Sequence, residues 1–206
     1  MVVIAIAQAR DAARAGVEAV AVKSLAAIVQ RRAAAPAPTE RALRAQPAAL
    51  AKLERQGLSF LPVRFGSVVN DEAELARLLA PMSAALKKAL ALTRGRHQMT
   101  VRVRGTRPKA PRTSGRAFLA ARARDARVPE ADPVRKAVAR LIAAEETGPA
   151  RGPYAGAVHH LVDAANIERY IAAVTDLQRR SPGRFVLSGP MPPFAFTAVA
   201  DLGGEA

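Results

Sequence analysis

His159, His160 and Asp163 are the side chains whose types and spacing come nearest to a catalytic or metal-binding site. Imidazole and carboxylate groups bind zinc and transfer protons, so such a cluster could hold a metal ion or act as a general base. The apolar stretch 154–162 predicts a strand, in which adjacent side chains point to opposite faces. The two histidines therefore cannot share one metal ion, and the sequence has no cysteine to complete a site. We predict a structural or surface role for this cluster, and the same role for His97.

Other patterns that accompany catalysis are missing from the sequence. It has no glycine loop for a phosphate, no serine at a strand-to-helix elbow and no pair of histidines on one helix face. Asp71, Glu72 and Glu74 form an acidic cluster, but they stand at the start of an expected helix, where carboxylates cap the first turn. We therefore predict that the protein is not an enzyme and uses no metal or cofactor.

The formal net charge of +15 is concentrated in one part of the chain. No acidic residue lies between Glu74 and Asp125, and the densest basic part of that stretch contains Arg94, Arg96, Arg102, Arg104, Arg107, Lys109, Arg112 and Arg116. Such a stretch is typical of a surface for nucleic acid, an anionic surface or an acidic protein. It is equally consistent with solvated helix faces. The strand expected at 97–104 has no aromatic side chain on which RNA bases could stack, so contacts to phosphate alone stay open.

The composition favours a soluble cytoplasmic protein. No apolar stretch approaches the length that crosses a bilayer, and residues 1–6 lack the basic region of a secretory signal. The absence of cysteine fits a reducing compartment. With 206 residues, half of them hydrophobic, the chain can form one or two domains.

The first half of the chain alternates strand and helix patterns. Residues 2–6 predict a strand, whereas residues 8–33 fit either a helix or two short strands at 17–22 and 25–29. The patterns that follow predict, in order, a helix at 39–56, a strand at 60–69, a helix at 71–93 and a strand at 97–103. Pro62 places its strand at a sheet edge or bulge, and Pro81 should kink or split its helix.

The second half begins with a loop rich in proline and basic residues. We expect this loop, 105–114, to separate two domains, 1–104 and 115–206. Residues 116–146 predict mostly helix, broken near Pro129 and Pro133. The later patterns predict a strand at 154–162, a helix at 166–180 and a strand at 185–187. The predicted fold class is α+β, with two small domains that have ferredoxin-like antiparallel sheets and helices packed on one face.

A segment stiffened by proline, residues 188–196, lies near the end of the chain. Its three prolines exclude a helix and make it a poor central strand. If the segment is extended, Phe194 and Phe196 point to one face. We expect it either to anchor the C-terminus in the protein's own fold, as an apolar plug that closes the second domain, or to present an apolar edge to a partner.

Five segments of the chain, taken in order, resemble the gas vesicle protein F/L family: Phe60–Val69, Arg94–Val103, Gly115–Leu119, Val158–Asp163 and Ser188–Phe196. Order and spacing match over residues 58–200. Two motifs carry most of the resemblance, and their residues are Leu61, Pro62, Val63, Arg64, Phe65 and Gly66 in the first, and Gly189, Pro190, Pro192, Pro193, Phe194 and Phe196 in the second.

The resemblance implies a cytoplasmic, vesicle-associated assembly factor or minor structural protein without catalytic activity. Its partners would be the small hydrophobic shell protein, which it would bind and chaperone, and other vesicle accessory proteins. A very apolar subunit needs such a partner before it polymerises. A basic protein that binds nucleic acid through residues 77–124 is the alternative.

The sequence departs from the family pattern at four positions. Met191, Phe194 and Ala195 stand where the family has Trp, Tyr and Ser, so the segment loses an indole N–H and two hydroxyls and should rely on packing. Gln98 replaces a Glu that we would expect to pair with Arg64, which leaves one neutral contact at best.

Overall fold

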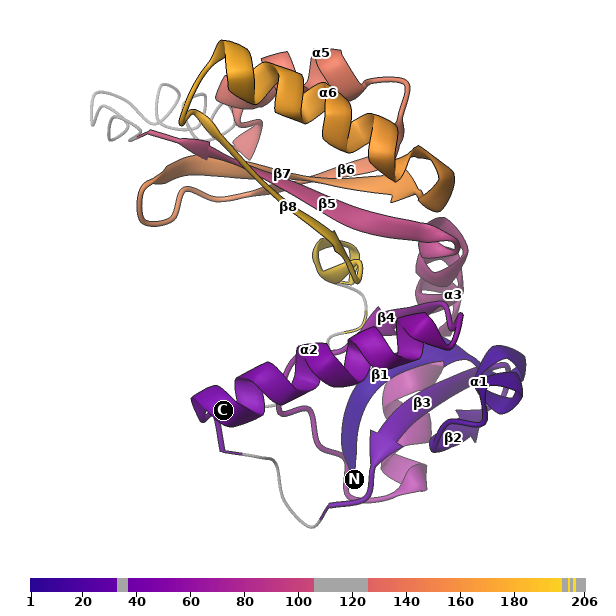
Figure 1. Cartoon of the computed structure of the whole chain (residues 1–206). Helices are drawn as coiled ribbons and strands as arrows, with labels where there is room; N and C mark the ends of the chain where they lie inside the picture. The colour runs from indigo at the N-terminus through magenta and orange to yellow at the C-terminus, as the bar shows by residue number, and fades with distance from the viewer. Residues whose placement is uncertain (33–36, 106–125, 198–199, 201, 203–206) are drawn as a thin grey trace, which may run out of the picture. The chain divides into compact units, whose positions relative to one another are not determined.

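The chain forms two compact units, each built on a four-stranded antiparallel sheet (Figure 1). The computed structural model describes residues 1–32, 37–105, 126–197, 200 and 202. The first unit contains Met1–Gly95 and Pro192–Ala206, and the second contains Arg96–Met191. The predicted α+β class with two antiparallel sheets is confirmed.

The first unit has the strand order β2-β3-β1-β4. Its elements are β1 (Val2–Gln8), α1 (Ala9–Ala15), β2 (Ala19–Val22), β3 (Leu25–Gln30), α2 (Glu40–Arg55), β4 (Phe60–Pro62) and α3 (Glu72–Thr93). The ambiguous stretch 8–33 therefore contains a short helix and then two strands, which turn at Lys23 with a positive φ of 56°. A hydrogen-bonded neighbour on each side of β3 explains why strand pairing prevails over the helix propensity of its alanines.

Helices cover both faces of the first sheet. Leu50 and Leu53 of α2 and Ala12 of α1 pack with Ile4 and Ile28 on one face. Leucines of α3 pack on the other face, together with Ala200 and Leu202 from the end of the chain. This apolar packing places the C-terminal segment in the first unit, although it follows the second unit in sequence.

Two proline-containing elements agree with the prediction only in part: Pro62 stands on an edge strand as predicted, but that strand is shorter than expected, and the helix with Pro81 does not split. The strand expected at 60–69 ends at Pro62, on the edge of the sheet, and the chain then turns between Arg64 and Ser67, where Gly66 has a φ of 82°. The helix α3 continues through Pro81 without a split. The predicted starts of α2 and α3 are confirmed, since Thr39 and Asp71 cap them with side-chain oxygens.

The second unit has the equivalent strand order, β6-β7-β5-β8, which is the ferredoxin-like arrangement. Its elements are β5 (Arg96–Arg104), η1 (Pro129–Ala131), α5 (Asp132–Val138), β6 (Ile142–Gly148), β7 (Tyr154–Asp163), η2 (Ala164–Asn166), α6 (Ile167–Arg180) and β8 (Phe185–Met191). Figure 1 shows α5 and α6 on the same face of this sheet. Tyr170 and Val174 of α6 pack there against Met99, Val101 and Val158.

The helix predicted at 116–146 is wrong for residues 142–146. These residues belong to β6, because they pair with β7 from Ile142 to Gly148. The segment contains two alanines and two glutamates, which favour a helix in isolation, and tertiary pairing overrides that preference. The earlier part of the predicted helix, residues 116–125, lies outside the described residues.

The boundaries between the two units lie at other positions in the sequence than the expected domain boundaries. Residues 96–104 pair with β7 and β8 and therefore belong to the second unit. Residues 192–206 belong to the first unit. The loop expected to separate the domains lies outside the described residues, except for Gly105.

Candidate functional site

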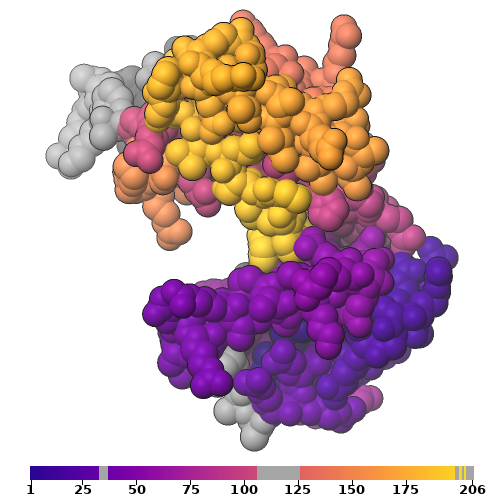
Figure 2. Space-filling view, viewed as in Figure 1, coloured from indigo at the N-terminus to yellow at the C-terminus, as the bar shows by residue number. Residues whose placement is uncertain are grey.

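The two family-like motifs meet in a groove of the first unit. Its lining comprises Leu43, Gln46 and Pro47 of α2, the motif residues 62–65, and Phe194, Ala195, Thr197 and Ala200 from the end of the chain. We call this cavity, with a volume of 450 Å³, the motif groove. Figure 2 shows α2, one of its walls, lying across the near face of the first unit.

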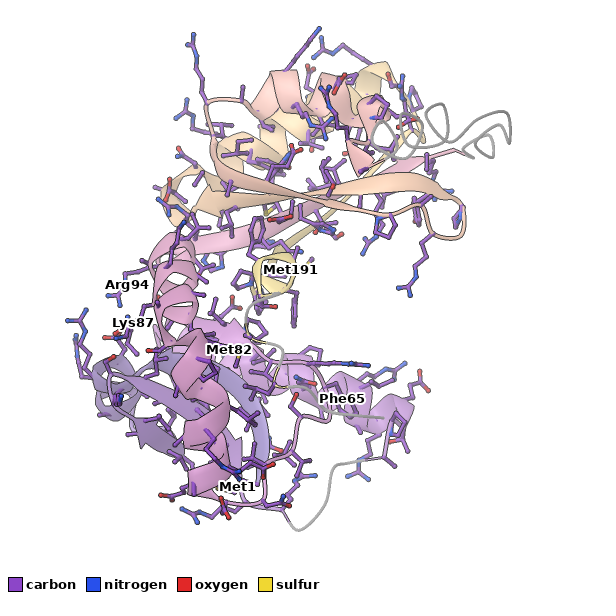
Figure 3. The ribbon with its side chains drawn as sticks, turned by 180° about the vertical axis from the view of Figure 1, so that it is seen from behind. Met1, Phe65, Met82, Lys87, Arg94 and Met191 are labelled. Carbon is purple, nitrogen blue, oxygen red and sulfur yellow. The ribbon has the colours of Figure 1, made fainter. Side chains whose placement is uncertain are left out.

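Hydrogen bonds hold the wall formed by the first motif. The Gln46 side-chain amide of α2 donates to the Val63 carbonyl oxygen at 3.0 Å. The Ser67 hydroxyl donates to the Arg64 carbonyl oxygen at 2.9 Å, which closes the turn after the motif. Leu61 and Val63 are buried, whereas Arg64 is exposed, and Phe65 lies beside α2 (Figure 3).

The opposite wall is a short 3-10 helix, η3 (Phe194–Phe196). The Thr197 hydroxyl donates to the Phe194 carbonyl oxygen at 2.8 Å, and Pro192 and Pro193 are buried. The predicted extended arrangement of Phe194 and Phe196 is therefore wrong, because these residues form a helical turn. Phe194 keeps 42% of its surface exposed, and Leu43 of α2 keeps 49%.

The residues of the second motif are divided between the two units. Gly189 and Pro190 lie in β8, the edge strand of the second sheet, whereas Pro192–Phe196 belong to the first unit. Gly189 has a φ of 120°, and a Cβ there would lie 2.7 Å from the Gln98 carbonyl oxygen, so only glycine fits. The interpretation of this segment as a plug of the second domain is wrong, because its aromatic half packs in the first unit.

The family model described as gas vesicle synthesis protein GvpL/GvpF matches residues 4–198. The chain belongs to the GvpL/GvpF family. Two crystal structures share its fold. The gas vesicle protein GvpF from Anabaena sp. PCC7120 is 14% identical, with a TM-score of 0.63 over 87% of this chain and 86% of that chain. GvpF from Microcystis aeruginosa is 12% identical, with a TM-score of 0.64 over 87% of each chain. A comparison with curated proteins found no match.

The family departure at Gln98 lies in the second unit. Gln98 is buried, and its amide nitrogen donates to the Thr100 hydroxyl at 2.9 Å and lies 3.8 Å from the Met191 sulfur. Met191 is another position at which we expect the sequence to depart from the family pattern, so the side chains of these two positions lie together. Arg64, the partner expected for position 98, belongs to the first unit.

The two adjacent histidines point to opposite faces of the second sheet, as predicted. His160 is fully buried on the helix-covered face, where its Nδ1 lies 2.7 Å from the Tyr170 hydroxyl and its Nε2 lies 2.8 Å from Glu145 Oε2. An ionised Glu145 only accepts, so His160 Nε2 carries the proton and Nδ1 accepts from Tyr170. Among the described residues, no cluster of histidine and acidic side chains could hold a metal ion.

Burial controls the ionisation of this network. It lowers the pKa of His160, although Glu145 opposes the change. Burial alone would raise the pKa of Glu145, but hydrogen bonds from Arg135 and His160 lower it. Burial also raises the pKa of the Tyr170 hydroxyl. The network is thus a neutral histidine beside an ion pair, in which Arg135 donates to Glu145 at 2.8 Å.

The structure separates the predicted basic patch into several environments. Arg94 pairs with Asp11 at 2.8 Å in the first unit, and Arg96 pairs with Asp163 at 2.9 Å in the second. Arg102 donates to Ser188, and the Arg104 guanidinium lies over the Tyr154 ring. Arg107, Lys109, Arg112 and Arg116 lie outside the described residues. Nucleic-acid binding by this stretch stays a prediction.

Sequence reasoning missed the contribution of α2 to the motif groove. Leu43 and Pro47 are exposed apolar residues one turn apart on α2. That spacing is the signal that could have indicated a third wall. No described helix is both long enough and apolar enough to cross a membrane.

Proposed function

We propose that the chain assists gas vesicle formation by binding the hydrophobic shell protein in the motif groove before the shell polymerises. Membership in the GvpL/GvpF family supports the gas vesicle role. The motif groove supports the binding step, because it combines apolar walls with two large exposed side chains, Leu43 and Phe194. Exposed apolar surface of this kind is typical of protein-binding sites.

One observation carries the proposal. The segments that resemble the family lie far apart in the sequence, yet Pro62–Phe65 and Phe194 line the same groove. A purely structural motif would bury its aromatic side chain. Phe194 is instead among the most exposed large hydrophobic residues of the described chain.

The groove also defines the chemistry of its partner segment. Its walls are mainly apolar, and Arg64 lies at its edge without an ion-pair partner in the described part of the chain. An apolar shell-protein segment with an acidic side chain beside Arg64 would satisfy both features. Hydrogen bonds hold both walls of the groove in place, so binding would cost little conformational entropy in these walls.

Gene replacement in a gas-vesicle-forming host tests this function. We expect deletion to abolish buoyant vesicles, and the double variant Leu43→Ser/Phe194→Ser to restore them at most weakly. The matched control is Val68→Ser, which removes an exposed apolar side chain of the same unit outside the groove and should restore buoyancy fully. Normal vesicles in cells that lack the gene and any paralogue would overturn the gas vesicle role. Full restoration by the double variant would overturn the binding role of the motif groove but would leave the gas vesicle role of the protein in place.

A further inference from the structure

A second groove lies in the second unit, on the sheet face opposite α5 and α6, and contains no residue of the two family motifs. It has a volume of 590 Å³, and the lining residues that matter here are Arg102, Gly148, Arg151, Tyr154, Gly156 and His159. We call it the hairpin groove, because the turn between β6 and β7 forms one side of it. We propose that the hairpin groove binds the phosphate group of a small ligand. This inference does not depend on the function proposed for the motif groove.

The turn that carries Arg151 is fixed by the backbone. Arg151 N–H donates to the Tyr154 carbonyl oxygen at 3.0 Å, and Tyr154 N–H donates back to Arg151 at 3.1 Å. Gly152 supplies the positive φ of 55° that this two-residue loop needs. Gly105 N–H also donates to the Pro153 carbonyl oxygen at 3.0 Å, which ties the turn to the end of β5. Arg151 therefore projects from an ordered hairpin.

His159 presents a hydrogen-bond donor to the groove. Its Nδ1 lies 3.0 Å from the Thr100 hydroxyl and 3.3 Å from the Gln98 amide nitrogen. An amide nitrogen only donates, so Nδ1 accepts and Nε2 carries the proton. Nε2 has no hydrogen-bond partner in the described part of the chain. It lies so close to Gly148 that a Cβ there would be 2.8 Å away, so the absence of a side chain at this position makes room for the ring.

The charges around the groove are basic. Arg102 donates from Nη1 to the neutral Ser188 hydroxyl at 2.9 Å, and Arg151 forms no ion pair with any described residue. Among the described residues, no carboxylate lines the groove. Glu146 is the acidic residue opposite His159 in the strand register, and it is exposed outside the lining. Burial, and then the charge of Arg102, lower the pKa of His159.

These groups match a phosphate better than a neutral ligand. Two guanidinium groups offer paired N–H donors that fit phosphate oxygens, and the imidazole N–H adds a third direction. Three glycines and Ala157 are among the lining residues, and none of them places a large side chain in the groove. The volume falls within the range of small-molecule sites, which leaves room for the group that carries the phosphate.

Calorimetric titration of the full chain tests the proposal, with inorganic phosphate and AMP as probes at constant ionic strength. We expect binding of at least one probe, weakened about tenfold or more by Arg151→Ala and by Arg102→Gln, as the loss of one charge-assisted contact predicts. The control Arg179→Ala removes the same charge from the exposed end of α6 and should leave the affinity unchanged. Addition of the probe should also shift the NMR signals of the His159 ring.

The outcomes separate the sources of the phosphate. Tighter binding of AMP identifies a nucleoside phosphate as the ligand class, whereas equal binding identifies phosphate itself. The absence of binding by both probes overturns the proposal. So does an equal loss of affinity in Arg179→Ala, which would show that net charge alone attracts the anion. Binding of a single-stranded oligonucleotide while both small probes fail would likewise contradict a small-ligand site.

Discussion

His160 is a polar side chain that the second unit buries completely. It is accommodated because Tyr170 donates to one ring nitrogen and Glu145 accepts from the other. Arg135 pairs with Glu145 and also donates to the Arg127 and Val128 carbonyl oxygens, so the charge of Glu145 is balanced. The alternation of side chains along a strand predicts that His159 and His160 point to opposite faces of the sheet. It does not identify Tyr170 of α6 as the hydrogen-bond partner of His160. A buried network of this kind requires the neutral imidazole.

We predict that the stability of the protein falls as the pH decreases below neutrality. The pKa of His160 is lowered in the fold, so the unfolded chain binds protons more readily. Stability is therefore lost as the pH falls through 6.5, the ordinary value for histidine, and the loss ends below the lowered pKa of the folded state. Glu145, whose pKa is also lowered, adds a further loss below its ordinary value of 4.5.

Urea unfolding at pH 7.5 and 5.5, followed by circular dichroism, measures this dependence. The variant His160→Gln keeps one donor and one acceptor but cannot titrate. Its free energy of unfolding should change less between the two pH values than that of the unsubstituted protein. A residual change is expected, because the pKa of His159 is also lowered. An equal change in both proteins would contradict the assignment of a neutral His160.

At the scale of elements, α3 shows how packing overrides a local break. Pro81 removes one backbone donor from the middle of the helix, yet Leu75, Leu79, Leu86 and Leu90 on either side are fully buried in the core of the first unit. The burial of these side chains outweighs the lost hydrogen bond. Pro81 itself is exposed, so it contributes little to that packing.

We predict that Pro81→Ala stabilises the protein by about 1–3 kcal/mol, because alanine restores the backbone hydrogen bond and relieves the ring clash. Urea unfolding measures the gain. Pro81→Gly is the matched control. It restores the same backbone donor, but its free energy of unfolding should be about 1 kcal/mol lower than that of Pro81→Ala, because glycine loses more backbone entropy in a helix. A destabilised Pro81→Ala variant would show that the proline has a packing role.

Elements with a strong local pattern could be predicted from the sequence. The capping residues Thr39 and Asp71 mark the starts of α2 and α3, and the alternation of Met99, Val101 and Val103 marks β5. Elements stabilised by distant partners could not. The strand β6 forms from residues with helix propensity because β7 pairs with it, and η3 forms where the prolines indicated an extended chain. The two motifs could be found in the sequence, whereas the wall that α2 adds to the groove has only the spacing of Leu43 and Pro47 as its sequence signal.

For the whole molecule, the main feature is the path of the chain through two units with equivalent strand order. The chain builds the first unit, continues from α3 into β5 of the second, and returns after Met191 to the first. Ala200 and Leu202 complete the core of the first unit. This return brings Phe194 beside the motif Leu61–Gly66 and creates the motif groove, so we expect its binding function to depend on the C-terminal segment.

Site-specific photo-crosslinking tests the central claim most directly. A photoreactive phenylalanine analogue is placed at Leu43, inside the motif groove, or at Val68, exposed outside it. Each protein is co-expressed with the other gas vesicle proteins and irradiated, and the adducts are identified by mass spectrometry. The account predicts an adduct with the shell protein from position 43 that is lost with Phe194→Ser, and none from position 68. No shell-protein adduct from position 43, or equal adducts from both positions, would contradict it.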